Sequence, residues 1–411
     1  MESGFDLLKE RGFVYQSSND QALRAALSRP ITLYCGYDPT ASSLTVGHLV
    51  PVMMLAHLQR TGHRTIALVG GGTTMVGDPT GKAEARQMLS LEQIASNQEG
   101  IKTQLGRHLD FTEGRALMLN NADWLPNLGY IQFLRDIGRH FSVNQMLQHE
   151  TYRERLNGSG LSFIELNYVL LQAYDFLHLY REYGCTLQVG GSDQWFNILA
   201  GSELIRRADG GEAYALVAPL ITTASGAKMG KTEAGAVWLS PERTSPYDFY
   251  QFWVNTEDAD VGRFLRFFTF LPEDEIIRLA ALEGAELRSS KELLAFEVTS
   301  MVHDAAAATD AQQAARALFG GDGGSLEGVP TTTIPEDQLT DGIEVVDLLV
   351  LGALAASRGA ARRLIGQGGV SLGDRRVDAA DFRISRSQFE QDGLLIRAGK
   401  KRFHRFILAQ S

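Results

Sequence analysis

Two short stretches of the sequence carry side chains that suit the binding of a phosphate group. Thr45 and His48 lie in the stretch TVGH, which follows an apolar run at 31–37 and opens a helical pattern of apolar residues. The N–H groups at a helix N-terminus attract anions, and a glycine there admits a flat ligand. Lys228 and Lys231 lie in the stretch KMGKT, where they could stabilise phosphate charge in a transition state. The ordinary alternatives are a polar corner and two solvated lysines.

A third group of polar side chains falls on one face of a helix predicted over 162–183. Tyr168, Gln172 and Asp175 are spaced at i, i+4 and i+7, so they share one stripe of that helix. The stripe could face solvent, but core-like apolar residues flank it. We therefore interpret these three side chains as one wall of a polar pocket.

Glycine-containing loops follow apolar runs that predict buried strands. The runs lie at 31–37, 64–69 and 185–189, and a helical pattern separates the first two. A strand, a helix and a strand form a parallel βαβ unit, whose ligands bind at the carboxyl ends of the strands. The loops that begin at Gly70 and Gly190 therefore belong to the same edge as TVGH. The first of them, GGGTTMVGDPTGK, lacks the spacing of a Walker phosphate-binding motif.

Changes of pattern along the 411 residues predict three domains. The predicted fold class is α/β: a Rossmann-like parallel-sheet catalytic domain with an insertion, then an α-helical domain, then a small α+β domain. The boundaries are 1–243 for the catalytic domain, with its insertion at about 83–160, 244–319 for the helical domain, 320–342 for a linker rich in Gly, Thr and Pro, and 343–411 for the last domain.

Charge is distributed unevenly along the chain. The net charge is −10, whereas residues 342–411 hold twelve Lys/Arg and seven Asp/Glu. A basic terminal domain on an acidic body suggests one module for a polyanion, and a basic helix beside a basic hairpin suits RNA. The predicted RNA-binding residues are Arg358, Arg362, Arg363, Arg375, Arg376, Lys400, Lys401 and Arg402. A small domain that only aids solubility is the alternative.

The composition argues against several other classes of protein. Cys35 and Cys185 are the only cysteines, so we expect neither a disulfide framework nor a metal cluster. No apolar run approaches the roughly 20 residues of a membrane span, and the first residues hold no signal-like core. We therefore expect a cytoplasmic protein with no membrane partner.

Several independent motifs together resemble one enzyme family. TVGH and KMGKT resemble the HIGH and KMSKS signatures of class I aminoacyl-tRNA synthetases. The stretches YCGYDPT, ALVGGGTTMVGDPTGK, LNYVLLQAYDF, VGGSDQWFNI and SPYDFYQFWVNT are similar to those of bacterial tyrosyl-tRNA synthetases. The tail SRGAARRLIGQGGVSLGDRRV resembles the S4 RNA-binding domain that ends those enzymes. The resemblance spans nearly the whole chain, with the motifs in the same order.

The resemblance implies a ligase that works in two steps. Tyrosine and ATP give tyrosyl-adenylate and pyrophosphate, and the tyrosyl group then passes to the 3′ end of tRNA-Tyr. Mg²⁺ is implied as the companion of ATP, without a protein-bound metal, and a homodimer is implied with its two-fold axis at the insertion. Such a reaction needs positioning and cationic stabilisation rather than a protein nucleophile, so the lack of a Ser-His-Asp constellation is expected.

The resemblance also implies roles for individual residues. The tyrosine pocket would be formed by Tyr34, Asp78, Tyr168, Gln172, Asp175 and Gln194. The ATP side would be formed by Gly36, Asp38, Gly47, His48, Asp193 and Lys231. The catalytic set, which stabilises the departing pyrophosphate, would be Thr40, Thr45, His48, Lys82, Arg86, Lys228, Lys231 and Thr232.

Two departures from the family signatures keep other interpretations open. Thr45 replaces the first histidine of HIGH, and Gly230 replaces the serine of KMSKS. A tryptophanyl-tRNA synthetase would share both signatures, although Tyr34 with Asp175 suits a phenol better. A nucleotidyltransferase of the same superfamily would lack the basic tail. A synthetase-derived RNA-binding protein that has lost catalysis is favoured by Thr45 and disfavoured by the two lysines of KMGKT.

Overall fold

The computed structural model describes residues 3–80, 89–158, 160–226, 229–232, 235–319, 325–339, 342–373, 375–389, 393–399 and 402–409. Its contacts divide the chain into two compact units. The first unit comprises Met1–Arg243 and Thr256–Leu294, and the second comprises Thr244–Asn255 and Ala295–Ser411. The helical stretch predicted over 244–319 therefore contributes to both units.

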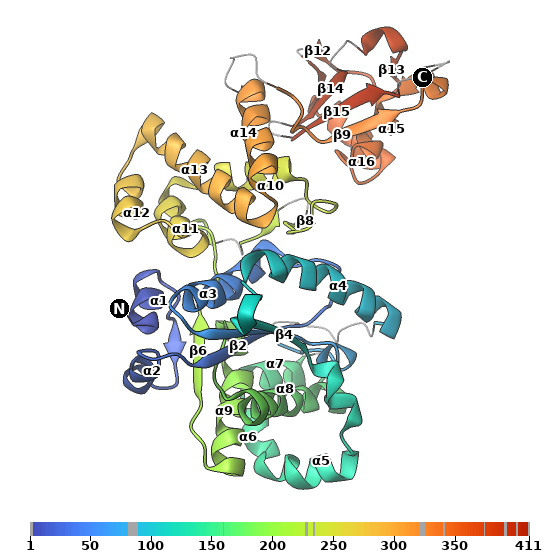
Figure 1. The fold of residues 1–411 in the computed structure, drawn as a ribbon. Helices are drawn as coiled ribbons and strands as arrows, with labels where there is room; N and C mark the ends of the chain where they lie inside the picture. Colours follow the sequence, from blue (N-terminus) through green and yellow to red (C-terminus); the bar gives the residue numbers. More distant parts are fainter. Residues whose placement is uncertain are drawn as a thin grey trace. The chain divides into compact units, whose positions relative to one another are not determined.

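A six-stranded sheet forms the centre of the first unit (Figure 1). Its order is β1-β6-β5-β2-β3-β4, and every neighbouring pair except β1–β6 is parallel. The strands are β1 (Gln16–Ser17), β2 (Thr32–Tyr37), β3 (Arg64–Val69), β4 (Ala116–Asn120), β5 (Cys185–Gly191) and β6 (Tyr214–Ala218). The chain moves outward from β2 through β3 to β4, and on the other side from β5 to β6. The order thus reverses between β2 and β5, which is where open parallel sheets bind their ligands.

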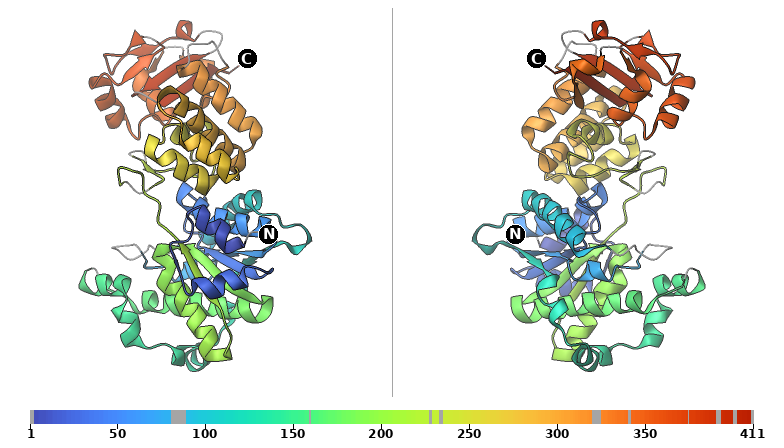
Figure 2. Two further views of the ribbon diagram at one scale, coloured as in Figure 1. Left: turned by 90° about the vertical axis from the view of Figure 1, so that its left-hand side faces the viewer. Right: turned by 90° about the vertical axis from the view of Figure 1, so that its right-hand side faces the viewer.

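Helices cover both faces of this sheet (Figures 1 and 2). One face carries α3 (Leu49–Arg60) and α4 (Leu91–His108), and the other carries α8 (Phe163–Tyr183) and α9 (Trp195–Asp209). α8 begins with a capping box between Ser162 and Glu165 and ends at Gly184, whose φ is 63°. These two caps fix the ends of the helix that was predicted to carry the polar stripe.

The other helices of the first unit lie at its amino end, in the insertion and in the segment after residue 256. They are α1 (Gly4–Glu10), α2 (Asp20–Ala26), α5 (Tyr130–Asp136), α6 (Val143–Gln148), α7 (Glu150–Asn157), α11 (Val261–Phe268) and α12 (Glu273–Ala280), while α13 (Gly284–Val302) spans both units. Within the described ranges, no helix has the length and apolar character that crossing a membrane requires.

The second unit combines helices with a five-stranded sheet of order β12-β11-β14-β15-β9. The strands of that sheet are β9 (Thr331–Ile334), β11 (Val370–Leu372), β12 (Arg375–Arg376), β14 (Leu394–Ala398) and β15 (Arg402–Leu408), and β10 (Ile343–Glu344) pairs separately with β13 (Arg383–Ile384). The helices are α10 (Pro246–Val254), α14 (Ala305–Phe319), α15 (Val345–Leu351) and α16 (Arg358–Gly366). Leu348, Ile365 and Phe406 belong to the apolar cluster that holds α15, α16 and the sheet together.

One strand of this sheet lies inside the stretch that the sequence predicts as a linker. β9 pairs in parallel with β15, from Thr331 opposite Arg405 to Ile334 opposite Leu408. It is an edge strand, and Ile334 is its only fully buried side chain. A run of three threonines beside glycines and prolines gives no apolar alternation, so the β-branched residues were the only local signal for this strand.

Candidate active site

The stretch TVGH forms a single 3₁₀ turn that leads directly into α3. The backbone N–H of Thr45 donates to Nδ1 of His48 over 3.1 Å, and the Thr45 hydroxyl lies 2.9 Å from the same nitrogen. Because a backbone N–H can only donate, Nδ1 must be the acceptor and the proton of a neutral His48 resides on Nε2. Thr45 therefore orients His48, which is exposed together with Gly47 at the carboxyl edge of the sheet.

The segment from Ile221 to Leu239, which we call the lysine loop, returns to this turn. The N–H of Val46 donates to the carbonyl of Val237 over 3.0 Å, and the N–H of Val237 donates to the carbonyl of Gly230 over 2.8 Å. Gly230 has a φ of 77°, and a Cβ at that position would lie 3.4 Å from Cβ of Val46. The structure thus brings the two predicted phosphate-binding stretches together. It also explains why a glycine stands at position 230, because that positive φ is unfavourable for serine.

Asp38, in the loop after β2, links three elements at the switch point. Its Oδ2 accepts a hydrogen bond from the hydroxyl of Tyr168 on α8 over 2.8 Å, and its Oδ1 accepts one from the hydroxyl of Thr73 over 2.7 Å. Gly70 lies directly beneath this carboxylate, since a Cβ there would approach Oδ1 to 1.9 Å. The glycine loop after β3 is therefore required for the position of Asp38.

A second carboxylate, Asp78, lies in the loop after β3 and is buried. Its Oδ2 accepts from Nε2 of Gln194 over 2.8 Å, and its Oδ1 accepts from the N–H of Thr80 over 2.9 Å. On α8, Oε1 of Gln172 is buried and has no hydrogen-bond partner among the described residues. A carboxylate, together with an amide oxygen that has no donor of its own, suits a protonated amine. This part of the site can therefore receive an ammonium group.

The deepest part of the site holds Asp175 and Tyr34. Asp175 is 2% exposed, and its oxygens accept from Nε1 of Trp124 over 2.7 Å and from Nδ2 of Asn121 over 2.8 Å. Burial raises the pKa of Asp175 to about 7, against the opposing effect of these two hydrogen bonds. Burial and the charge of Asp175 likewise raise the pKa of Tyr34, which is 1% exposed. The Tyr34 hydroxyl has no hydrogen-bond partner within the described part of the chain.

Asn121 and Trp124 are site residues that the sequence interpretation missed. Asn121 also donates to the hydroxyl of Thr73 over 3.0 Å and accepts from the N–H of Gly72 over 2.7 Å. It therefore ties Asp175 to the glycine loop after β3. The available signal was their place just after β4, because strand ends of one parallel sheet meet at one edge. The residue types alone do not predict that these two side chains bond to a carboxylate some 50 positions away.

The remaining predicted residues are distributed as follows. Gly36 lies on β2 with open space where a Cβ would be, and Thr40 and Asp193 are exposed at the same edge. Lys82, Arg86 and Lys228 lie outside the described residues, and for Lys231 and Thr232 only the backbone, in the short strand β7 (Lys231–Thr232) opposite β8 (Gly235–Ala236), is described. Among the described residues, no three His, Cys, Asp or Glu side chains gather as a metal site.

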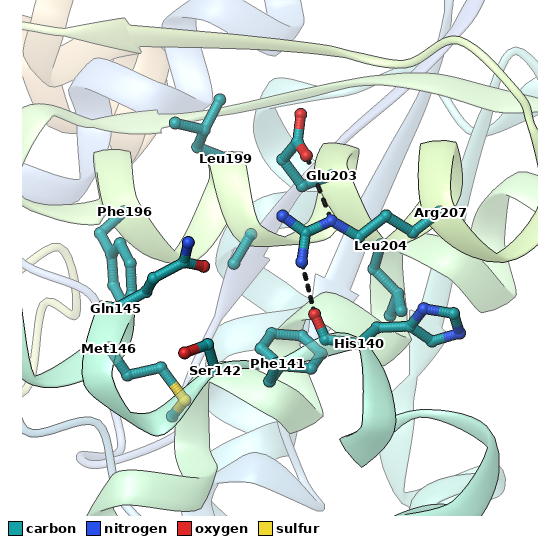
Figure 3. Close-up of a pocket in the computed structure, with 11 residues that line it drawn as sticks. His140, Phe141, Ser142, Gln145, Met146, Phe196, Leu199, Glu203, Leu204 and Arg207 are labelled. Carbon is teal, nitrogen blue, oxygen red and sulfur yellow. Dashed lines mark hydrogen bonds and ion pairs between the residues drawn. The ribbon is translucent and has the colours of Figure 1, made fainter.

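A separate cavity lies between the insertion and α9 (Figure 3). Apolar side chains such as Phe141, Met146 and Leu199 line it. Arg207 closes one end by donating to the carbonyl of His140 over 2.6 Å. None of the predicted site residues lines this cavity, so it is distinct from the site described above.

Comparison with known proteins decides the family. Residues 26–320 match the family model described as tRNA synthetases class I (W and Y), and residues 324–406 match the tyrosine–tRNA ligase C-terminal domain model. The tyrosine–tRNA ligase of Desulfatibacillum aliphaticivorans is 54% identical, with 98% of both chains covered. The chain belongs to the tyrosine–tRNA ligase family. Its predicted assignment to the class I tyrosyl-tRNA synthetases is thereby confirmed.

Other members of the family give the same result. The tyrosine–tRNA ligase of Clostridium botulinum strain Hall is 51% identical over 99% of this chain and 100% of its own. Among solved structures, the C-terminally truncated mitochondrial tyrosyl-tRNA synthetase of Aspergillus nidulans matches with a TM-score of 0.71 and 30% identity, over 78% of this chain and 95% of its own. The predicted α/β fold class is also confirmed.

Membership of this family decides between the activities that the sequence left open. The protein is a ligase that activates tyrosine with ATP and charges tRNA, as predicted. The tryptophan-specific, nucleotidyltransferase and non-catalytic interpretations are therefore excluded.

Proposed function

We propose that tyrosine binds with its phenol between Tyr34 and Asp175. The observation that carries this proposal is the buried Tyr34 hydroxyl, which has no hydrogen-bond partner among the described residues and lies within the electrostatic influence of the Asp175 carboxylate. A phenolic hydroxyl can donate to that carboxylate and accept from Tyr34 at the same time. In this orientation the ammonium group of tyrosine would lie against Asp78 and Gln172, close to Tyr168 and Gln194.

This proposal predicts that tyrosine binding weakens below neutral pH. With a pKa of about 7, Asp175 of the free protein becomes protonated as the pH falls, and a protonated carboxyl loses its full strength as an acceptor for the phenol. The dissociation constant should rise roughly tenfold between pH 7.5 and pH 6, while the phenol and amino groups of tyrosine titrate well above this window. Equilibrium dialysis checks this, and a constant affinity over that range would contradict it.

The raised pKa of Asp175 makes folding stability depend on pH in the opposite direction to tyrosine binding, so that stability is greater at lower pH. The folded protein holds a proton on Asp175 more tightly than the unfolded chain does, since its pKa rises from 3.8 to about 7. The associated stabilisation is therefore present below about pH 4 and is lost as the pH rises through 7. Ligand-free protein should accordingly melt at a slightly lower temperature at pH 8 than at pH 6 from this group alone.

We further propose that ATP lies over Gly36 and against the turn that begins α3. Open space above Gly36 admits a flat ring, and Nε2 of His48 offers a donor for a phosphate or ribose oxygen. Asp38, Gly47 and Asp193 would border the bound nucleotide, and Mg²⁺ would arrive with it. No side chain has to act as a nucleophile, because the carboxylate of tyrosine attacks the α-phosphorus itself.

The proposed role of the lysine loop is to stabilise the departing pyrophosphate, together with Thr40, Thr45, Lys82 and Arg86. Lys231→Ala should slow tyrosyl-adenylate formation by roughly 10²–10³-fold, because one cationic contact to the transition state is lost, and tyrosine affinity should stay within twofold. Lys102→Ala removes a lysine from the exposed face of α4 and serves as the control. Single-turnover adenylation measures both variants, and equal rates would contradict the role.

For tRNA, we propose that the exposed arginines of the S4-like C-terminal domain contact phosphates. Arg362 and Arg363 are exposed on α16, and Arg375 and Arg376 are exposed on β12. Three of the predicted contacts have polar partners in the structure: Arg376 pairs with Asp378, Arg358 pairs with Glu344 and Asp347, and Arg402 donates to the carbonyls of Ala353 and Leu354. Lys400 and Lys401 lie outside the described residues.

Replacing Arg362 and Arg363 together by alanine should weaken tRNA binding and lower its salt dependence. The slope of log K against log salt should become shallower by roughly two, because two phosphate contacts are lost. Tyrosine activation without tRNA should be unchanged. Arg386→Ala, which removes an exposed arginine paired with Glu336, is the matched control. An unchanged slope in the double variant would show that these arginines do not contact the tRNA.

We also propose that the protein is a cytoplasmic homodimer joined through the insertion. Large apolar side chains are exposed on α5 to α7 of this region and at the start of α8, which follows it: Tyr130, Ile131, Val143, Leu156, Phe163 and Ile164. An apolar patch of this kind is typical of an interface rather than of a monomer surface. Sedimentation equilibrium tests the proposal, and Ile131→Glu, which changes a side chain 75% exposed, should dissociate the dimer.

A further inference from the structure

The lysine loop is held at its two ends by different parts of the first unit. Its carboxyl end is bonded to the turn before α3, through Val237 and through the N–H of Leu239, which donates to the carbonyl of Leu44 over 2.9 Å. Its amino end, residues 222–225, is bonded instead to the segment 257–263 that leads into α11. Within the loop, the amino end is joined to the middle, because the N–H of Met229 donates to the carbonyl of Ile221 over 3.0 Å.

Asp260 is the centre of the attachment at the amino end. Its side chain is 3% exposed, and Oδ2 accepts a hydrogen bond from the N–H of Ala224 over 2.8 Å. Its Oδ1 accepts from Arg263 over 2.6 Å, and the same Arg263 nitrogen also donates to the carbonyl of Thr222. Asp260 stands at the N-cap of α11 but makes no capping hydrogen bond with its side chain. This buried carboxylate therefore bonds to the lysine loop and to the Arg263 side chain, rather than to the backbone N–H groups at the start of its own helix.

The helix that carries this attachment is itself fixed to the nucleotide-binding part of the unit. α11 packs against α3, whose amino end is the turn that holds His48. Arg11 secures the end of α11 by donating to the carbonyls of Thr269 over 2.9 Å and of Leu271 over 2.7 Å. Both ends of the lysine loop are thus connected to the same helix, α3. The carboxyl end is bonded to the turn that precedes α3, and the amino end is bonded to the segment before α11, which packs against α3.

We propose that Asp260 and Arg263 are positioning residues for the adenylation step. They hold the amino end of the lysine loop at a fixed distance from the turn that carries Thr45 and His48. Neither residue belongs to the predicted tyrosine, ATP or catalytic sets, and neither contacts the Tyr34–Asp175 pocket through any described hydrogen bond. The inference rests on the catalytic role proposed above for the lysine loop. A displacement of about 1 Å at a reacting centre can cost about 100-fold in rate, so loss of this attachment should be visible in adenylation.

The test compares Asp260→Asn and Arg263→Gln with Asp258→Asn. Asp258 lies two residues away in the same 3₁₀ turn, is 74% exposed and pairs with Lys291 rather than with the loop. The readouts are the single-turnover rate of adenylation, the KM for ATP, the equilibrium dissociation constant for tyrosine and the melting temperature. Asp260→Asn and Arg263→Gln should lower the adenylation rate by roughly 10- to 100-fold with tyrosine affinity within twofold. Asp258→Asn should match the unmodified protein in all four.

Two results would overturn the proposal. Either adenylation at the rate of Asp258→Asn, or tyrosine affinity that falls in parallel with the rate, would show that the pair has only a general structural role. Arg263 is 42% exposed, so Arg263→Gln keeps the test valid if Asp260→Asn does not fold. Lys231→Ala separates this proposal from the one on which it rests. If Lys231→Ala is slow while Arg263→Gln is normal, the positioning role alone fails. If Lys231→Ala is normal, the role of the loop fails.

Discussion

Asp175→Asn is expected to slow tyrosine activation severely in a protein that still folds. The substitution keeps the shape of the side chain but replaces one acceptor oxygen by an NH₂ group. Trp124 and Asn121 both donate to Asp175, so the new amide must turn its donor toward one of them or toward the substrate phenol. The rate of adenylation should fall by about 10³-fold, equivalent to roughly 4 kcal/mol.

The control for this substitution is Asp209→Asn, which changes a partly exposed carboxylate paired with Arg181 at the end of α9. It should alter adenylation less than twofold, because it lies outside the site and surface ion pairs contribute about 0–1 kcal/mol. Tyrosine binding by equilibrium dialysis, single-turnover adenylation and a thermal melt should be recorded for both. If Asp175→Asn retained tyrosine affinity and rate within threefold, Asp175 would not be the partner of the phenol.

Gly70→Ala is expected to inactivate the site without changing any group that touches the substrate. The added methyl would lie 1.9 Å from Oδ1 of Asp38 and 2.5 Å from the hydroxyl of Thr73, which is impossible without movement. Displacing Asp38 breaks its hydrogen bonds to Tyr168 and Thr73, and Thr73 is in turn bonded to Asn121. Adenylation should fall by about 10²-fold or more, since placement errors near 1 Å have effects of that size.

Gly106→Ala provides the matched control for that glycine substitution. Gly106 lies in α4, and a Cβ there would meet nothing within 4 Å. Alanine is favoured over glycine in a helix by about 1 kcal/mol, so this variant should melt at a slightly higher temperature with unchanged activity. If Gly70→Ala were as active as Gly106→Ala, the dependence of Asp38 on the glycine loop would be refuted.

The elements that carry the site could be predicted because their patterns are local. The apolar run at 31–37 became β2, and the helical pattern over 162–183 became α8 with Tyr168, Gln172 and Asp175 on one side. Period and capping residues are properties of adjacent positions, so they can be recognised in one sequence. The meeting of TVGH with KMGKT followed from the resemblance, and the hydrogen bonds from Val46 to Val237 and from Val237 to Gly230 now give it a physical basis.

The parts that could not be predicted depend on contacts between distant positions. Asn121 and Trp124 reach Asp175 only because β4 ends at the same edge as β2 and β3. Asp260 has the sequence context of a helix cap, yet its carboxylate bonds to a loop 36 positions earlier. The positive φ of Gly230 explains why a glycine stands there, whereas the sequence showed only that it replaces the serine of KMSKS. In each case tertiary structure selected one of several local possibilities.

The most direct test of the central claim is ATP–pyrophosphate exchange with each of the twenty amino acids, measured without tRNA. The account predicts exchange with tyrosine and very little with phenylalanine, because phenylalanine leaves the buried Asp175 carboxylate and the Tyr34 hydroxyl without their phenolic partner. Exchange with phenylalanine as fast as with tyrosine would show that this pair does not select the substrate. Exchange with tryptophan, or with no amino acid, would contradict the account of the site as a whole.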